Sequence, residues 1–420
     1  MHTPGMLDLF PDSARIDGGE LSLGGVPVSR LADEHGTPLL VYCEHTVRAQ
    51  ARAYRDAAPD ALIVYGTKAF ASIELLRVLA EEGIGADVST LGELAFARAA
   101  GLAADHLLFH GNNKSDEELR AAAEAGATVV LDAPDEPRRA AAAGVRRVLV
   151  RLTPGVEAVT HQAIATAHDE SKFGLGADDA LAAIEAARTL GLDVAGIHFH
   201  VGSQLEQIDE SLLAVDRLAA FCERAAAELG WSPSVIDLGG GLGVRHNRDE
   251  HPPEVGEWVR PLVARLRERR PAPAQVVFEP GRSLVSRAGV SLYRVGVVKE
   301  SGGVSYAAID GGMSDNPRPQ LYGARYEALL ATRADELATG VYRVAGKHCE
   351  SGDVLIDAAE LPRPERGDLL AVPATGAYTL ALSSNYNGLP RPEVVLVRDG
   401  RATVIRRRES VDDLLRLESS

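Results

Sequence analysis

The hydrophobic residues between positions 60 and 282 fall into short runs, and longer segments rich in Ala, Leu and Glu separate these runs. The runs are rich in Val, Ile and Leu, as parallel strands buried on both faces are. They occupy residues 61–66, 85–89, 106–111, 128–133, 147–153, 195–202, 234–241 and 275–281. The segments between them, such as 72–83 and 91–101, have the spacing of amphipathic helices that end at a glycine. This alternation favours a (β/α)₈ barrel over a doubly wound open sheet.

The pattern changes near residue 286. Beyond it, turn residues separate five strand-like segments, which lie at 290–301, 306–312, 340–349, 368–375 and 393–408. They predict an antiparallel β domain, and the β-like stretch at residues 20–44 is a candidate member of it. We therefore expect a TIM barrel at residues 37–285 and a β domain formed by residues 1–36 plus 286–420. The Ala-rich stretch 121–143 is expected to be helical.

Charge and composition exclude several classes of protein. The chain has 60 Asp and Glu against 44 Lys and Arg, a net charge of −16, which argues against nucleic acid or an anionic membrane surface as a main partner. It shows neither an apolar run long enough to span a membrane nor a signal sequence, so we expect a cytoplasmic location. Cys43, Cys222 and Cys349 have no paired spacing, and no metal-ligand cluster is visible, so neither a disulfide framework nor a metal site is expected.

Unusual side chains gather at the carboxyl ends of the predicted strands, where barrel enzymes place their active sites. Strand alternation sets His198 and His200 on one face, directed into the barrel mouth. The same alternation pairs Gly66 with Lys68, at the edge of an apolar interior where desolvation would lower the lysine pKa. Taken alone, Lys68 is more simply an ion-paired or snorkelling lysine, and His198 a hydrogen-bonded barrel residue.

A glycine-rich loop, residues 238–243, follows the seventh predicted strand. Its backbone N–H groups can approach a phosphate, as in barrels that bind phosphate after strands seven and eight, although a tight turn also explains a glycine triplet. The eighth strand ends in Glu279 and Arg282. A lysine, an imidazole, a glycine loop and a carboxylate at one mouth together indicate pyridoxal phosphate. Lys68 would form the Schiff base, and Glu279 would keep the pyridine nitrogen protonated.

Motifs along nearly the whole chain resemble those of the diaminopimelate decarboxylases, a branch of the alanine racemase-like (fold type III) pyridoxal-phosphate enzymes. They are YGTKAF (65–70), GELAFARAAG (92–101), FHGNNKS (109–115), SKFGLG (171–176), HFHVGSQ (198–204), DLGGGLG (237–243), EPGR (279–282), DGGMSDNPRPQLYGARY (310–326), CESGD (349–353) and GAYTLALSSNYN (376–387). CESGD and the RPxLYG pattern are specific to this branch. The first motif departs from the more common YAxKAN but keeps its lysine.

The resemblance implies a role for individual residues. Lys68 and Cys349 would be catalytic, with Cys349 or a water that it orders returning a proton. The cofactor-binding residues would be Lys68, His200, Ser203, Gly240, Gly241, Glu279, Gly281, Arg282 and Tyr378. The substrate-binding residues would be Arg282, Arg318, Tyr322, Glu350 and Tyr378.

The implied reaction is the decarboxylation of meso-diaminopimelate to L-lysine, with the sites shared across a homodimer. The non-reacting end of this substrate is a zwitterion, so it needs both a cation and an anion, which Arg318 and Glu350 supply. One alternative is another decarboxylase of the same scaffold, acting on ornithine or arginine, or a racemase, against which Glu279 argues. The other is a non-catalytic pyridoxal-phosphate-binding protein, against which the β domain with CESGD argues.

Overall fold

The computed structural model describes residues 5–153, 155, 171–269 and 275–418. The chain divides into two compact units. We call residues 50–243 and 252–283 the barrel unit, and residues 1–49, 244–251 and 284–420 the β unit.

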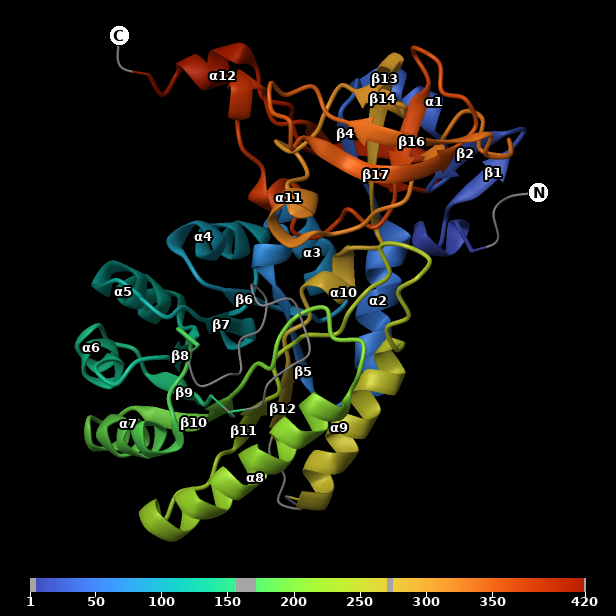
Figure 1. Cartoon of the computed structure of the whole chain (residues 1–420). Helices are drawn as coiled ribbons and strands as arrows, with labels where there is room; N and C mark the ends of the chain where they lie inside the picture. Colours follow the sequence, from blue (N-terminus) through green and yellow to red (C-terminus); the bar gives the residue numbers. More distant parts are fainter. Residues whose placement is uncertain (1–4, 154, 156–170, 270–274, 419–420) are drawn as a thin grey trace. The chain divides into compact units, whose positions relative to one another are not determined.

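Within the described part of the barrel unit, eight parallel strands close into a barrel (Figure 1). In order they are β5 (Leu62–Gly66), β6 (Gly85–Val88), β7 (Leu107–Phe109), β8 (Thr128–Leu131), β9 (Arg147–Arg151), β10 (Asp193–His198), β11 (Val235–Asp237) and β12 (Gln275–Phe278). Pairing of β12 with β5 closes the ring. Every strand coincides with a predicted hydrophobic run, so the barrel prediction is confirmed.

One layer of apolar side chains fills the barrel interior. Seven of the strands each contribute one buried member: Val64, Leu108, Val130, Leu149, Ala195, Val235 and Val277. Because side chains alternate along a strand, the residue two positions further on again faces inward, nearer the carboxyl end. Any site at the carboxyl ends of the barrel strands therefore lies directly above this apolar layer.

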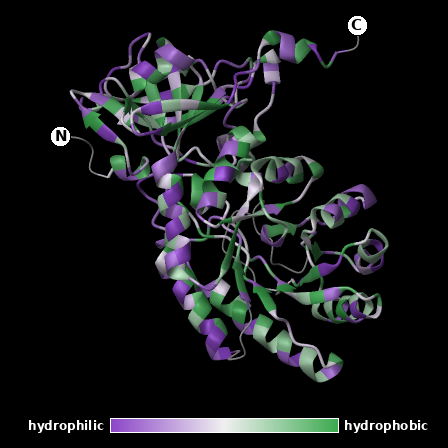
Figure 2. Cartoon of the chain, turned by 180° about the vertical axis from the view of Figure 1, so that it is seen from behind, coloured by the Kyte–Doolittle hydropathy of each residue, from purple (hydrophilic) through white to green (hydrophobic). Residues whose placement is uncertain are grey.

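Helices surround the strands (Figure 1), and Figure 2 shows hydrophobic residues along the strands and both colours on the helices around them. They are α3 (Ile73–Glu81), α4 (Leu91–Ala100), α5 (Asp116–Ala125), α6 (Glu136–Ala142), α7 (Ala177–Thr189), α8 (Asp209–Leu229) and α9 (Val255–Arg269). The prediction of helix across 121–143 is wrong, because β8 separates α5 from α6. Gly126, at φ +69°, ends α5 in the left-handed conformation, and a β-branched run follows it.

The β unit contains two sheets. The larger one runs β17 (Val354–Leu361), β16 (Gly340–Ala345), β14 (Val304–Ile309), β13 (Gly289–Ser301), β4 (Leu39–Cys43), β19 (Glu393–Arg398) and β20 (Arg401–Arg406), with β15 (Leu329–Leu330) and β18 (Leu369–Val372) off this path. The smaller one is β1 (Arg15–Asp17), β2 (Glu20–Leu23) and β3 (Val26–Pro27). The larger sheet is mostly antiparallel, as predicted, but β14–β16 and β4–β19 are parallel pairs. Each parallel pair is joined by a long connection instead of a hairpin.

Strand β4 lies between β13 and β19. The N-terminal β-like stretch therefore joins the β domain as expected, but β4 falls inside the range 37–285 that we assigned to the barrel. The structural division lies at residues 49/50 because the apolar side chains of β4 are buried in the β-unit core. The remaining α-helices are α1 (Val28–His35), α2 (Glu44–Ala57), α10 (Arg282–Val285), α11 (Arg318–Tyr322) and α12 (Val411–Leu415). Among the described residues, no helix has the length and apolar character needed to cross a bilayer.

Candidate active site

Buried polar side chains lie directly above the apolar layer of the barrel. They are Asp87, His110, Asp132, Arg151, His198, Asp237 and Glu279. On five strands the polar residue comes two positions after the apolar one, and on β10 a bulge shifts the register so that His198 lies level with Asp237. Gly66 takes the corresponding place on β5, level with Asp87. The carboxyl ends of the strands thus form a polar layer.

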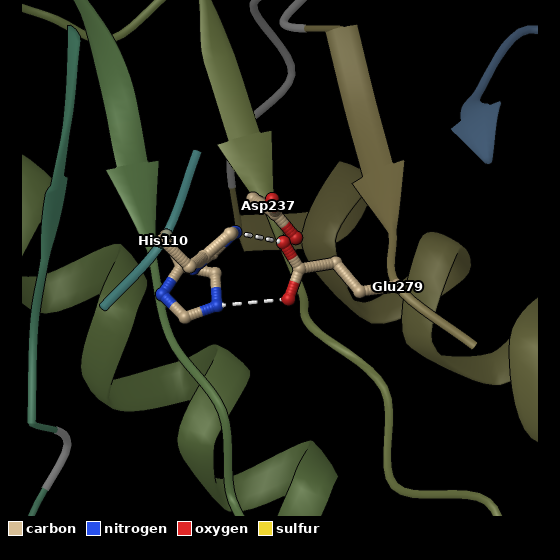
Figure 3. A group of neighbouring side chains, drawn as sticks. His110, Asp237 and Glu279 are labelled. Carbon is tan, nitrogen blue, oxygen red and sulfur yellow. Dashed lines mark hydrogen bonds and ion pairs between the residues drawn. The ribbon is translucent and has the colours of Figure 1, made fainter. Parts of the chain in front are cut away.

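Glu279 is the centre of this layer. His110 Nε2 lies 2.6 Å from Glu279 Oε1, and His198 Nε2 lies 3.2 Å from Glu279 Oε2. The two imidazole rings pack edge to face, with centroids 4.8 Å apart. Figure 3 shows the side chains of His110 and Asp237 directed toward the Glu279 carboxylate. His198 is therefore a paired barrel residue, as its simpler interpretation predicted.

The electrostatics separate the two buried carboxyl groups. Burial by itself would raise the pKa of Glu279, but the imidazoles of His110 and His198 outweigh burial and hold this pKa well below its usual range. Burial raises the pKa of Asp237 well above its usual range, and the neighbouring charge of Glu279 raises it further. Burial also lowers the pKa of His198 to about 4. The pairing with two imidazoles thus favours the ionised form of Glu279, whereas burial favours the protonated form of Asp237.

Lys68 lies just past the end of β5, in the 3₁₀ turn Thr67–Ala69. The strand alternation that we used for Lys68 therefore does not apply to it. Its Nζ lies 3.7 Å from Asp87 Oδ2, and its side chain is 56% exposed. The structure therefore places the Lys68 side chain at an accessible position and not inside the apolar interior. It is an accessible amine paired with a buried carboxylate.

The glycine-rich loop fits closely between neighbouring strand ends. A Cβ on Gly240 would lie 2.4 Å from the carbonyl oxygen of Glu279, and one on Gly241, at φ +124°, would lie 2.7 Å from that of Gly202. The Gly240 N–H donates to His200 Nδ1 at 3.3 Å. Only glycine fits these positions, so the loop presents bare backbone beside the imidazole of His200.

A cation and a hydroxyl lie at the same mouth. Arg282 begins α10 directly after the EPG turn, and its Nη2 donates to Ser203 Oγ at 3.1 Å. Guanidinium, hydroxyl and glycine backbone together have the chemistry of a phosphate site. Gly281 completes the turn, close to Gly66. With the amine of Lys68 and the carboxylate of Glu279, this mouth fits pyridoxal phosphate group by group.

The polar layer also contains a grouping that we did not expect from the sequence. His110, His198, Asp237 and Glu279 each offer one ligand atom, and these atoms lie within 4.8 Å of one another. The residues are far apart in the sequence, so no spacing motif reveals them. Such a set has the chemistry to bind a divalent cation, but each oxygen of Glu279 is already paired with an imidazole.

The remaining predicted residues belong to the β unit. Arg318, at the start of α11, is buried and donates to Tyr326 Oη at 2.5 Å, while Tyr322 is half-buried at the end of the helix. Gln320 Nε2 donates to the carbonyl oxygens of Gly352 and Val354, both at 2.9 Å. The structure thus ties α11 to the CESGD loop.

Cys349 and Glu350 are exposed within that loop. The Cys349 N–H donates to Asn387 Oδ1 at 2.9 Å, which connects the loop to the segment that follows Tyr378. Tyr378 itself is half-buried and has a positive φ of +59°. Three segments therefore carry five predicted residues of the β unit, and hydrogen bonds link the CESGD loop to each of the other two segments.

Asp353 fixes the CESGD loop, a role that the sequence analysis missed. Its Oδ1 accepts from the Met313 N–H at 2.7 Å, and its Oδ2 pairs with His348 Nδ1 at 2.6 Å. Cβ atoms on Gly312 or Gly346 would lie within 2.5 Å of this carboxylate. Gly312 of DGGMSDN and Gly346 therefore make room for Asp353, and His348 is its partner.

A hollow of about 910 Å³ in the β unit lies elsewhere, along α11 and β17. Its lining includes Arg248, Glu327 and Glu360 but none of the predicted site residues. Arg248 pairs with both of these glutamates, at 2.6 and 3.4 Å. The hollow therefore offers little uncompensated charge to a ligand.

Comparison with known proteins agrees with this site. Residues 44–286 match the family described as "Pyridoxal-dependent decarboxylase, pyridoxal binding domain". The fold and the site thus define a pyridoxal-dependent decarboxylase, and the cofactor is pyridoxal phosphate.

Relatives narrow the class. The diaminopimelate decarboxylase of Actinosynnema pretiosum subsp. auranticum is 46% identical, over 98% of this chain and 95% of its own length. That of Bacillus subtilis (strain 168) is 40% identical over 95% of each chain. A solved diaminopimelate decarboxylase from M. jannaschii, in complex with L-lysine, superposes with a TM-score of 0.89 at 31% identity, over 96% of this chain and 97% of that one. The chain belongs to the diaminopimelate decarboxylase family.

Proposed function

We propose that the protein catalyses the pyridoxal-phosphate-dependent decarboxylation of meso-diaminopimelate to L-lysine and CO₂, the last step of lysine biosynthesis. The observation that carries this proposal is the Glu279 carboxylate, paired with His110 and His198, at the same barrel mouth as the accessible amine of Lys68. When bound, the cofactor supplies a protonated pyridine ring that withdraws electrons from the bond to the departing carboxylate. Lys68 supplies the amine that binds the cofactor aldehyde, and Glu279 keeps the ring nitrogen protonated.

The other residues bind and orient. Ser203, Gly240, Gly241, Gly281 and Arg282 hold the phosphate, with Tyr378 as a further contact, and His200 stacks on the ring. Arg282, Arg318 and Tyr322 bind substrate carboxylates, and Glu350 receives the distal ammonium. A fixed cation and a fixed anion together select a zwitterionic end over a simple ammonium. Cys349 Sγ supplies a proton to the substrate carbon that has lost its carboxylate.

We also infer a cytoplasmic homodimer in which each site draws residues from two chains. Support for the location comes from the three cysteines, all of which are free thiols, as in proteins of reducing compartments. Support for the dimer comes from the resemblance, which places the CESGD motif with Cys349 and Glu350 over the partner's barrel.

A parallel assay of the holoenzyme tests the function. Meso-diaminopimelate, ornithine, arginine and lysine are supplied separately, and CO₂ release is measured. We expect release from diaminopimelate alone. Comparable release from ornithine would favour the activity named for a more distant structural relative, the lysine/ornithine decarboxylase of Vibrio vulnificus (TM-score 0.77, 25% identity, covering 89% of this chain and 97% of that one). Release from none of the four would favour a non-catalytic binding protein.

A further inference from the structure

The Glu279 carboxylate has more partners than its contact with a cofactor requires. We propose that His110 and His198 are positioning residues, which hold Glu279 ionised and fixed in orientation so that it can receive the ring nitrogen of the pyridine cofactor. This inference rests on the proposed function, since it deepens the role that Glu279 has there.

The first step is the state of the carboxyl group. A buried carboxylate without partners takes up a proton, and a neutral carboxyl group would no longer stabilise a protonated pyridine. Each oxygen of Glu279 has one imidazole partner. His110 Nε2 lies 2.6 Å from Oε1, and His198 Nε2 lies 3.2 Å from Oε2. Each carboxylate oxygen can accept two hydrogen bonds, so both pairs leave capacity for a ring N–H.

The second step is orientation. His110 follows β7 and His198 ends β10, and neither strand is a neighbour of β12 in the barrel. The two imidazoles therefore reach Glu279 across the barrel interior from separate strands. Both are buried, and each ring packs against the edge or face of the other. The His110 backbone N–H also donates to the carbonyl oxygen of Val88 at 2.8 Å, which fixes its position on the mouth.

Asp237 supports the same carboxylate. Its Oδ1 accepts from the Gly239 N–H at 2.9 Å, while its buried Oδ2 has no hydrogen-bond partner among the described residues. The ligand atoms of Asp237 and Glu279 lie within 4.8 Å of each other, so a proton on Oδ2 would make Asp237 a third donor beside Glu279. Asp237 and Glu279 would then carry one negative charge between them. The bond from the Gly239 N–H also connects Asp237 to the glycine-rich loop.

The experiment separates orientation of Glu279 from general stability. Apoenzyme variants are titrated with pyridoxal 5′-phosphate and with a carbocyclic analogue that has C–H in place of the ring nitrogen. The variants are His110→Ala, His198→Ala, His198→Gln and, as reference, Glu279→Ala. We expect each histidine-to-alanine change to weaken pyridoxal phosphate binding by about 10-fold or more, the loss typical of a hydrogen bond to a charged group. Analogue binding should stay within about twofold of wild type, because the analogue has no ring nitrogen for Glu279 to receive.

Two controls define the result. His198→Gln keeps an N–H donor and should restore most of the lost affinity. His106→Ala removes a histidine from the opposite end of the β7 strand and should bind both ligands as wild type does. Where circular dichroism shows that an alanine variant has lost its fold, leucine at the same position fills the space without a donor and takes its place.

Equal weakening for both ligands, or no weakening for either, would overturn the inference. The proposed function fails in a different way. If the wild-type protein and Glu279→Ala discriminate equally between the two ligands, Glu279 does not receive the ring nitrogen at all.

Discussion

Lys68 differs from the polar layer beneath it because more than half of its side chain is exposed. Since so little packing depends on Lys68, Lys68→Ala should fold normally. We expect it to lose the yellow absorbance of lysine-bound cofactor and to lose turnover on the order of 10³-fold or more, as loss of a covalent-catalysis residue does. Borohydride reduction of the wild-type holoenzyme followed by peptide mapping checks the assignment. A label on Lys172 instead would contradict it, and Lys172→Ala is the matched control.

Arg318 and Glu350 differ in environment although both are assigned to substrate. Arg318 is buried against Tyr326, whereas Glu350 is exposed. Glu350→Gln and Arg318→Ala should each lower kcat/KM for diaminopimelate and leave cofactor absorbance unchanged. Where the contact is desolvated, the loss corresponds to about 2–5 kcal/mol of interaction free energy. Tyr326→Phe keeps the guanidinium and serves as the control, with a small effect expected. A variant that loses cofactor but keeps substrate affinity would show that these roles are misassigned.

At the scale of elements, strand content is readable from the sequence but the partners of strands are not. The eight barrel strands are continuous apolar runs because they are buried on both faces. Nothing in residues 39–43 shows that β4 inserts between β13 and β19, since that pairing depends on residues about 250 and 350 positions away.

The polar layer was partly accessible from the sequence. His110 and Asp237 come two residues after Leu108 and Val235, so counting inward positions along each run would have placed them beside Glu279. Each of these strands has only three residues, which is too few for alternation to show which face is inward. Lys68 could not be placed this way because it lies in a 3₁₀ turn.

The loops after β7 and β8 depend on one buried ion pair. Lys114 Nζ lies 2.9 Å from Glu136 Oε1, with both side chains fully buried, and Glu136 Oε2 also accepts from the Asp132 N–H at 2.6 Å. Lys114→Met should destabilise the protein by about 3–5 kcal/mol, because it leaves a buried carboxylate without its cation. Urea denaturation of the apoprotein measures this. The double variant Lys114→Met/Glu136→Leu should recover much of the loss, and failure to do so would mean that the pair is not what Lys114 stabilises.

The loop Asp310–Asn316 has its own pH dependence. Burial raises the pKa of Asp315 to about 6, although hydrogen bonds from Tyr293 Oη and the Gly312 N–H oppose this. The folded state therefore binds the proton more tightly than the unfolded state. This contribution to stability is fully present below pH of about 4 and is lost as the pH rises through about 6. Asp315→Asn should reduce the dependence of the free energy of unfolding on pH between these two values. The measurement is the difference in unfolding free energy between the variant and wild type at each pH. An unchanged slope would contradict the shift.

At the scale of the whole molecule, the predicted site residues fall into two groups on two units. Lys68 belongs to the barrel unit, and Cys349 follows some 280 positions later in the β unit. In an isologous dimer, two chains present the same surfaces to each other, so a site that takes one residue from each chain occurs twice. The proposed homodimer therefore makes a prediction that no single-chain site makes.

Lys68→Ala and Cys349→Ala should each be nearly inactive alone. When the two variants are refolded together in equal amounts, about half of the dimers are mixed, and each mixed dimer has one site with both wild-type residues. Roughly a quarter of wild-type activity should return. Refolding each variant with itself is the control for the procedure. If both residues act within one chain, every site keeps one lesion, and mixing restores no activity at any ratio of the two variants.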